Sequence, residues 1–135
     1  PSLQYSTVKR VLVHKSMEIL LNFQWRAGLL RVLGMKTNGA VATLTNFMGT
    51  DAWKDIMKQR LPPEQKMRQI LKLYLRDFER CFSNIECLEI PPNSKIPQYF
   101  LVFATNRSVV AKGMKKVMDH IRIRYYKQKR SSSIK

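Results

Sequence analysis

The stretch Gln98-Tyr-Phe-Leu-Val-Phe-Ala-Thr105 gives the clearest indication of how this chain folds. It is rich in aromatic and branched side chains, which are typical of a β-strand. A second run, Ile85 to Ile90, precedes it, and the connector between them contains Pro91-Pro92-Asn93-Ser94-Lys95. Proline, asparagine and serine are typical turn residues. The two runs therefore predict a β-hairpin with a long loop, within an α/β domain.

Helices are predicted on both sides of this hairpin. After it, Asn106 or Ser108 caps a final helix. Before it, Pro63 to Phe82 has the apolar stripe of an amphipathic helix, and Thr50 caps a shorter helix to about Arg60. The positions of the final helix that we expect to face inward are Val110, Met114, Val117, Met118, Ile121 and Tyr125.

The N-terminal third predicts a strand between helices. Met17 to Phe23 is a short apolar run that follows a helix over residues 6–15, and it is typical of a buried parallel strand. Gln24 to Leu33 predicts another helix, for which Gly34 is the stop signal. Residues 35–49 carry little charge and several glycines and asparagines. We expect them to form a loop with a helical turn inside it.

The length of 135 residues favours a single domain. We expect this domain to span residues 1–126, followed by a basic, serine-rich flexible tail over 127–135. No apolar run reaches the roughly 20 residues of a membrane helix, and no signal peptide is recognisable, so we expect a cytoplasmic protein with no membrane partner. Because the first residue is Pro1, we expect a processed chain or a fragment of a longer protein.

The sequence contains no self-contained catalytic motif and no metal-ligand spacing. The glycines form no phosphate-binding loop, and a Gly-x-Ser-x-Gly elbow is absent. Asp51 and Asp55 share a helix face, where acidic residues suit the helix dipole. The two cysteines, Cys81 and Cys87, are expected to be reduced thiols, because the chain lacks the further cysteines and histidine clusters of a disulfide scaffold or metal site. Whether the protein is an enzyme is left open.

Charge is the strongest functional indication. The chain has 25 Lys and Arg against 9 Asp and Glu, a formal net charge of +16. Residues 107–135 hold ten basic residues and one acidic residue, Asp119, which gives +9. Such a segment favours phosphate binding, and interleaved tyrosines favour base stacking; the alternative is a solvated helix face. The candidate nucleic-acid-binding residues are Lys112, Lys115, Lys116, Arg122, Arg124, Tyr125, Tyr126, Lys127, Lys129 and Arg130.

The order of elements resembles the back half of a Rossmann-like methyltransferase, in which the last two strands form a hairpin and the final strand inserts antiparallel. The chain also resembles the three-Cys-motif partner proteins, a methyltransferase-like family, through a strand ending in Asn-Phe, a Gly-x-x-x-Trp motif, and a final strand before a lysine-rich helix. The segments that carry this resemblance are Met17-Glu-Ile-Leu-Leu-Asn-Phe23, Gly49-Thr-Asp-Ala-Trp53, and Tyr99-Phe-Leu-Val-Phe-Ala-Thr-Asn106 with Lys115 and Met118.

The resemblance implies a partial Rossmann-like, methyltransferase-type sheet with a helical insertion and a C-terminal β-hairpin plus helix. It covers most of this chain but only the C-terminal part of such a protein. The glycine-rich turn that holds S-adenosylmethionine and its acidic ribose partner are absent. The cofactor is therefore expected only if a missing N-terminal part completes the site. The candidate cofactor-binding residues are Asn22 and Phe23 at the end of the first strand, although Asn22 has the alternative role of ending the strand through local backbone hydrogen bonds.

Three functions remain open. The first is a methyltransferase-like portion that holds a nucleic acid, DNA or RNA, and is not catalytic alone. The second is a winged-helix DNA-binding module, whose wing is the 91–95 loop. The third is a structural domain that binds an acidic protein. We also expect a homodimer or an N-terminal half to cover unpaired strand edges.

The three functions predict different observations. A parallel pair between Met17–Phe23 and Gln98–Thr105 favours the first. A three-helix core with an isolated hairpin favours the second. Absent or salt-insensitive binding of nucleic acid leaves the third.

Overall fold

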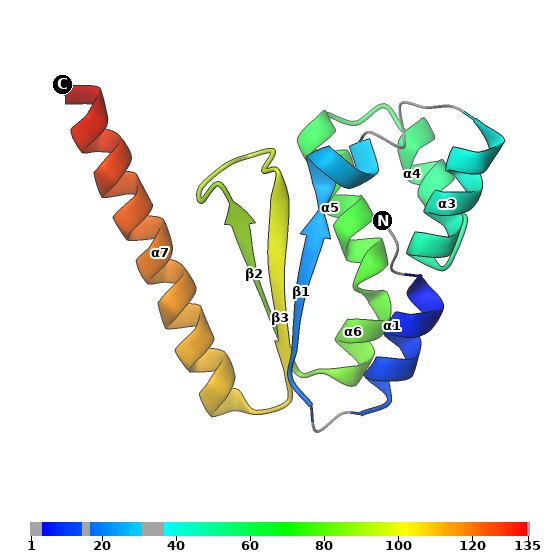
Figure 1. The fold of residues 1–135 in the computed structure, drawn as a ribbon, viewed down its shortest axis with the longest axis horizontal. Helices are drawn as coiled ribbons and strands as arrows, with labels where there is room; N and C mark the ends of the chain where they lie inside the picture. Colours follow the sequence, from blue (N-terminus) through cyan, green and yellow to red (C-terminus); the bar gives the residue numbers. More distant parts are fainter. Residues whose placement is uncertain (1–3, 15–16, 31–36, 135) are drawn as a thin grey trace.

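The structure, a computed structural model, describes residues 4–14, 17–30 and 37–134. Its elements form three layers (Figure 1). A sheet of three strands is the middle layer, with a single long helix on one face and the shorter helices on the other. The strands are β1 (Ile19–Gln24), β2 (Asn84–Ile90) and β3 (Tyr99–Thr105), and the long helix is α7 (Ser108–Ile134).

The opposite face of the sheet carries the remaining helices. They pack against one large core, in which Phe23, Phe47 and Tyr74 are in ring contact. No helix in the described ranges is both long and apolar enough to cross a membrane. The elements are α1 (Tyr5–Leu12), the π-helix η1 (Trp25–Leu30), α3 (Asn38–Met48), α4 (Trp53–Lys58), α5 (Pro63–Tyr74) and α6 (Arg76–Cys81).

The sheet has the order β1-β3-β2, and β3 is antiparallel to both neighbours. The β2–β3 hairpin and the mixed α/β class are confirmed. The expected parallel pair between the first strand and Gln98–Thr105 is wrong. Because β3 returns from the hairpin and lies between the other two strands, it runs opposite to both, so that β1 and β2 are parallel to each other without touching.

Strand β1 is not the doubly buried strand that its apolar run predicts. Its side chains alternate, with Phe23 fully buried and Leu20 64% exposed. Among the described strands it pairs only with β3 and forms an edge of the sheet. Burial of one face by the helices accounts for three of its four apolar residues, Ile19, Leu21 and Phe23, and leaves Leu20 unexplained.

The expected loop over residues 35–49 is wrong where the structure describes it, because residues 38–48 form helix α3. The Thr37 side chain accepts a hydrogen bond from the Ala40 amide and caps the helix. Ala40, Leu44 and Met48 recur every four residues and are buried. The glycine and asparagine content concealed this stripe, since both residues are common in loops.

Other boundaries also shift. The helix expected over residues 63–82 is divided at Leu75 into α5 and α6. The helix expected over residues 24–33 begins as η1, and its last three residues and Gly34 lie outside the described residues. Helix α7 continues to Ile134, through the segment expected to be a flexible tail.

Gly49 ends α3 in a left-handed conformation, with φ of 70°. A Cβ added there would run into the ring of Tyr5, which is buried and donates a hydrogen bond to Asp77 Oδ2 at 2.9 Å. Glycine is therefore required twice, by its backbone and by the close approach of Tyr5.

Replacing Gly49 by Ala should lower the free energy of unfolding by about 1–3 kcal/mol, the cost of a left-handed non-glycine residue, and more if Tyr5 must move. Urea titration followed by tryptophan fluorescence measures this change. Gly39→Ala is the control, because a Cβ there meets nothing within 4 Å inside α3. Equal stabilities for the two variants would contradict the role assigned to Gly49.

Candidate nucleic-acid interface

Helix α7 packs on the sheet through one apolar face. Met118 is 3% exposed and clusters with Phe103 of β3 and Leu88 of β2. Val110 and Met114 pack against the same cluster. Of the positions expected to face inward, Val117 and Ile121 are instead exposed, at 53% and 38%. The first half of α7 is thus held by a small core, and its polar faces are left to solvent.

Arg122 fixes α7 to the edge of the sheet. Its Nη2 donates to Glu89 Oε1 at 2.8 Å and to the Cys87 carbonyl at 2.7 Å, and its Nη1 donates to Asp119 Oδ1 at 3.0 Å. The bond to Cys87 satisfies a backbone group on edge strand β2. This guanidinium, a candidate for phosphate binding, is therefore committed to an internal network.

The turn after β2 completes the network. Asn93 adopts a positive φ of 64° and donates from its backbone amide to Glu89 Oε2 at 2.7 Å. Its side-chain Nδ2 donates to the Arg122 carbonyl at 3.3 Å. Sequence reasoning missed Glu89 and Asn93 as anchors of α7. An asparagine after two prolines does indicate a turn with a left-handed residue. Nothing in the local sequence indicates its contact with Arg122, which lies 29 residues further along the chain.

The pKa of the Glu89 carboxyl lies below its ordinary value of 4.5. Burial acts to raise this pKa, but hydrogen bonds from Arg122 and from the Asn93 amide favour the ionised form and outweigh it. Glu89 thus remains ionised at neutral pH, and the pKa of Arg122 is raised chiefly by its hydrogen bond to Glu89.

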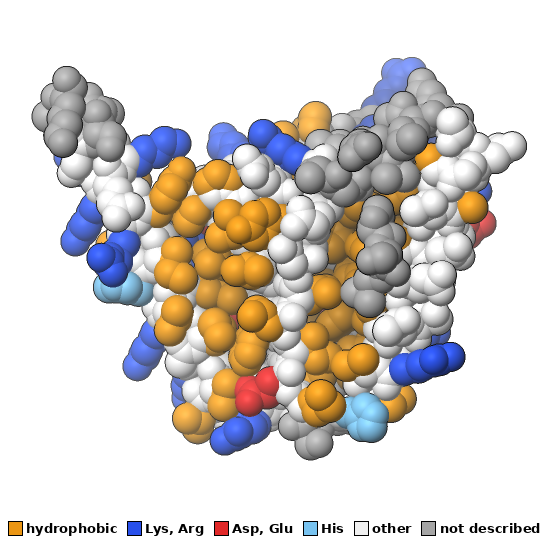
Figure 2. Space-filling model, in the orientation of Figure 1, with side chains coloured by type: hydrophobic (Ala, Val, Ile, Leu, Met, Phe, Trp, Pro, Cys, Tyr) orange, Lys and Arg blue, Asp and Glu red, His pale blue; other side chains and the backbone are white. Residues whose placement is uncertain are grey.

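The outward-facing cations of α7 have a different environment. Figure 2 shows lysine and arginine side chains along the flank where α7 lies. Five of these cations are exposed: Lys112, Lys115, Lys116, Arg124 and Lys127. Within the described ranges, no carboxylate lies at ion-pair distance from any of the five.

The two tyrosines of α7 differ in accessibility. Tyr125 is half-buried, and the Lys129 ammonium lies 5.8 Å from the centre of its ring. Tyr126 is 59% exposed. It lines an open groove of about 530 Å³, formed where α7 leaves the sheet beside the Asn93 turn. The rest of its lining includes Arg122, Ile123, Lys127 and Arg130. The groove thus combines an aromatic and an aliphatic side chain, Tyr126 and Ile123, with three cationic ones.

The candidate cofactor residues do not converge on one site. Phe23 is fully buried in the helical core, where it contacts Phe47 and Tyr74. Asn22 is exposed, and strand alternation turns its side chain to the opposite face of β1. A single ligand cannot contact both, so the described residues do not fit an S-adenosylmethionine site, and we derive no chemistry through that cofactor.

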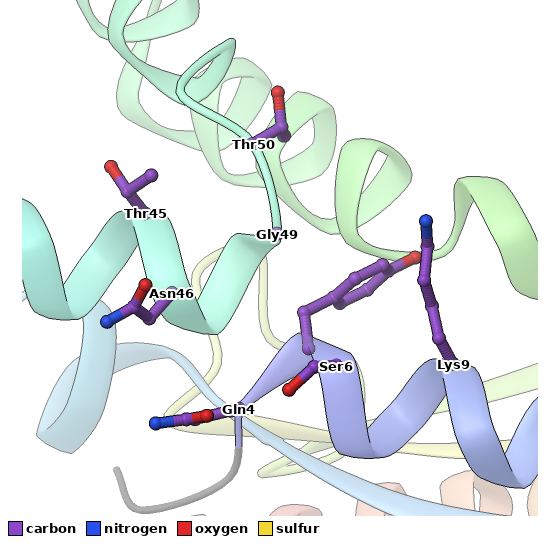
Figure 3. Close-up of a pocket in the computed structure, with 8 residues that line it drawn as sticks. Gln4, Ser6, Lys9, Thr45, Asn46, Gly49 and Thr50 are labelled. Atoms are coloured by element: carbon purple, nitrogen blue, oxygen red, sulfur yellow. The ribbon is translucent and has the colours of Figure 1, made fainter.

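A second hollow, of about 350 Å³, lies between the start of α1 and the end of α3 (Figure 3). Asn46 of α3 lies on the side of Gln4, whereas Thr45 points away and accepts a hydrogen bond from Trp53 Nε1 at 3.2 Å. Lys9 is the one charged residue of the lining. The lining holds no carboxylate, thiol or imidazole.

The two cysteines lie at the end of α6 and within β2. Cys81 and Cys87 are both free, as expected. Burial raises the pKa of the Cys87 thiol to about 11, which keeps it protonated and unreactive. In the part of the chain that the structure describes, no three His, Cys, Asp or Glu residues cluster as a metal site would require.

Comparisons with protein-family models, with curated proteins and with solved structures found no match to this chain.

Replacing Arg122 by Gln should lower the free energy of unfolding by about 1.5 kcal/mol at neutral pH. This is the lower end of the range for hydrogen bonds to charged groups, because the Arg122 side chain is 27% exposed. Because the pKa of Glu89 is lower in the folded state, the contribution is complete above about pH 4.5 and is lost as pH falls through the folded-state value.

Urea unfolding of the wild type and of Arg122→Gln across an acidic pH series measures this loss and its pH dependence. The difference in unfolding free energy between the two proteins should shrink as the pH falls below 4.5. A difference that stays constant with pH would show that Glu89 acts without its charge.

Proposed function

We propose that this chain is a nucleic-acid-associated domain that presents the outer face of α7 to the phosphate backbone, and that it resembles the C-terminal half of a methyltransferase-like protein. The observation that carries the proposal is the set of exposed cations on α7 that no described carboxylate neutralises. Phosphates bind such cations with release of counterions.

The shape of α7 supports this proposal. Its 27 residues extend about 40 Å at the ordinary rise of an α-helix. Lys112, Lys116, Arg124 and Lys127 span about 22 Å of this length and lie on the side away from Met118, which faces the sheet. A row of charges of this length suits an extended polyanion better than a single small anion.

The strand order gives mixed support to the methyltransferase-like part of the proposal. The parallel pair between Met17–Phe23 and Gln98–Thr105 that would favour it is absent, but the position of the last strand agrees with it. The last strand, β3, lies between β1 and β2 and is antiparallel to both. Insertion of the last strand in this way is what the resemblance implies. The chain is not catalytic alone in this proposal, and S-adenosylmethionine would bind only with residues from an additional N-terminal part.

The winged-helix alternative has less support. It expects an isolated hairpin, whereas β1 pairs with β3 from Ile19 to Gln24. It also expects the 91–95 loop to reach DNA as a wing. In the structure Asn93 of this loop is hydrogen-bonded to Glu89 and to the Arg122 carbonyl of α7.

The proposal predicts which cations determine the salt dependence of binding. Replacing Lys112, Lys116, Arg124 and Lys127 together by Gln, a good helix former, should reduce the slope of log affinity against log salt by about 3 for duplex DNA. Fluorescence anisotropy with labelled duplex DNA, single-stranded DNA and RNA across a salt series measures the slope.

The matched control replaces four exposed cations outside α7, Arg10, Lys58, Arg60 and Lys72, by Gln. It removes the same charge and should change the slope much less. Equal slopes for the two variants would mean that only net charge acts. Absence of binding by the wild type at low salt would overturn the proposal and favour an acidic protein as the partner.

A further inference from the structure

The outer edge of β1 carries backbone groups with no partner among the described strands. The Trp25 amide donates to the Gln98 carbonyl at 3.0 Å, in continuation of the β1–β3 register. In an antiparallel pair, hydrogen-bonded residues alternate with residues that point away. The N–H and C=O groups of Leu20, Asn22 and Gln24 therefore point to the free edge.

Apolar surface borders this edge on the face that carries the short helices. An almost wholly apolar groove of about 110 Å³ is lined by Val8 and Val11 of α1, Ile19 and Leu21 of β1, and Phe78 of α6. Thr7 is the one polar residue of its lining. A strand added at the edge would place every second side chain against this groove.

Apolar surface borders the edge on the α7 face as well. Leu20 is opposite Phe103, which packs on α7, so the Leu20 side chain lies on this face. Helical geometry places Val117 and Ile121 on the flank of α7 away from Arg122. Since Arg122 reaches β2, that flank is turned toward β1. Figure 2 shows hydrophobic side chains gathered between α7 and the strands.

The edge also lacks the charges that normally protect exposed strands. Residues 19–24 of β1 contain no charged side chain. The nearest charge before the strand, Glu18, lies 3.8 Å from Arg107. An edge of this kind accepts an uncharged strand with apolar side chains on the face of the short helices and an apolar side chain that can meet Leu20 on the other.

We propose that β1 pairs antiparallel with β1 of a second copy of this chain, so that two sheets join into one across a two-fold axis. Strand β1 itself is uncharged, with the partly buried Ile19 and Leu21 on the face of the short helices, and with Leu20, Asn22 and Gln24 on the α7 face. An antiparallel pair of identical strands is self-complementary, as a two-fold interface must be.

The positive charge of α7 lies away from this contact. Helix α7 packs over β2 and β3, so the two α7 helices stand on opposite sides of the β1 pair. Strands are spaced about 4.8 Å apart, and several strands therefore separate the helices. That distance exceeds the roughly 8–10 Å over which surface charges act at physiological salt.

Sedimentation equilibrium of the chain without nucleic acid, over a dilution series at physiological salt, tests the proposal. The wild type should be a dimer that dissociates on dilution. Leu20→Lys should be monomeric at every concentration tested, because it places a charge on the edge at a side chain that is already 64% exposed. The matched control is Val109→Lys, at an 81% exposed position of α7, and it should behave as the wild type.

Amide hydrogen exchange locates the interface. In the wild-type dimer, the amides of Leu20, Asn22 and Gln24 should exchange slowly, and in Leu20→Lys they should exchange at the rates of exposed amides. A dimer that Leu20→Lys does not dissociate would overturn the proposal. A wild type that is monomeric throughout would also overturn it, and would leave the edge to a strand from a different chain. Neither result depends on nucleic-acid binding.

Discussion

The structure depends on the pairing of β3 with a strand on each side. Its residues are the most buried of the sheet, with Val102 and Ala104 fully buried between the layers. One face of β3 contributes to the helical core and the other contributes Phe103 to the cluster under α7. Because β3 is central, β1 and β2 are the edges of the sheet. What covers each edge determines which surfaces of the protein are available for binding.

The two edge strands of the sheet differ in what covers them. At β2, the network of Arg122, Glu89 and Asn93 holds α7 across the edge and uses up one of its cations. Lys112, Lys116, Arg124 and Lys127 lie on the outer side of the helix, where we propose that they meet phosphates. At β1, no described element covers the edge, and its uncharged sequence favours pairing with another strand.

The sequence predicted the elements with strong local patterns and missed those set by distant contacts. The hairpin was predicted from its aromatic and β-branched residues and from the turn residues between its strands. The final helix was predicted from its apolar stripe. Helix α3 was missed because Asn38 and Gly39 look like loop residues, although Thr37 caps the helix. The direction of the β1–β3 pair was not encoded in the apolar run of β1. Likewise, basic composition predicted a charged α7, but only the fold shows that Arg122 is bound to Glu89, 33 residues away.

The central claim is that the outer face of α7 is the surface that meets a polyanion. Lysine acetylation read by mass spectrometry, with and without an RNA or DNA oligonucleotide, tests it most directly, because every lysine reports in one experiment. The account predicts that bound nucleic acid protects Lys112, Lys116 and Lys127 and leaves Lys58 and Lys72 as reactive as in the free protein. Protection of Lys58 and Lys72 with no protection on α7 would contradict it.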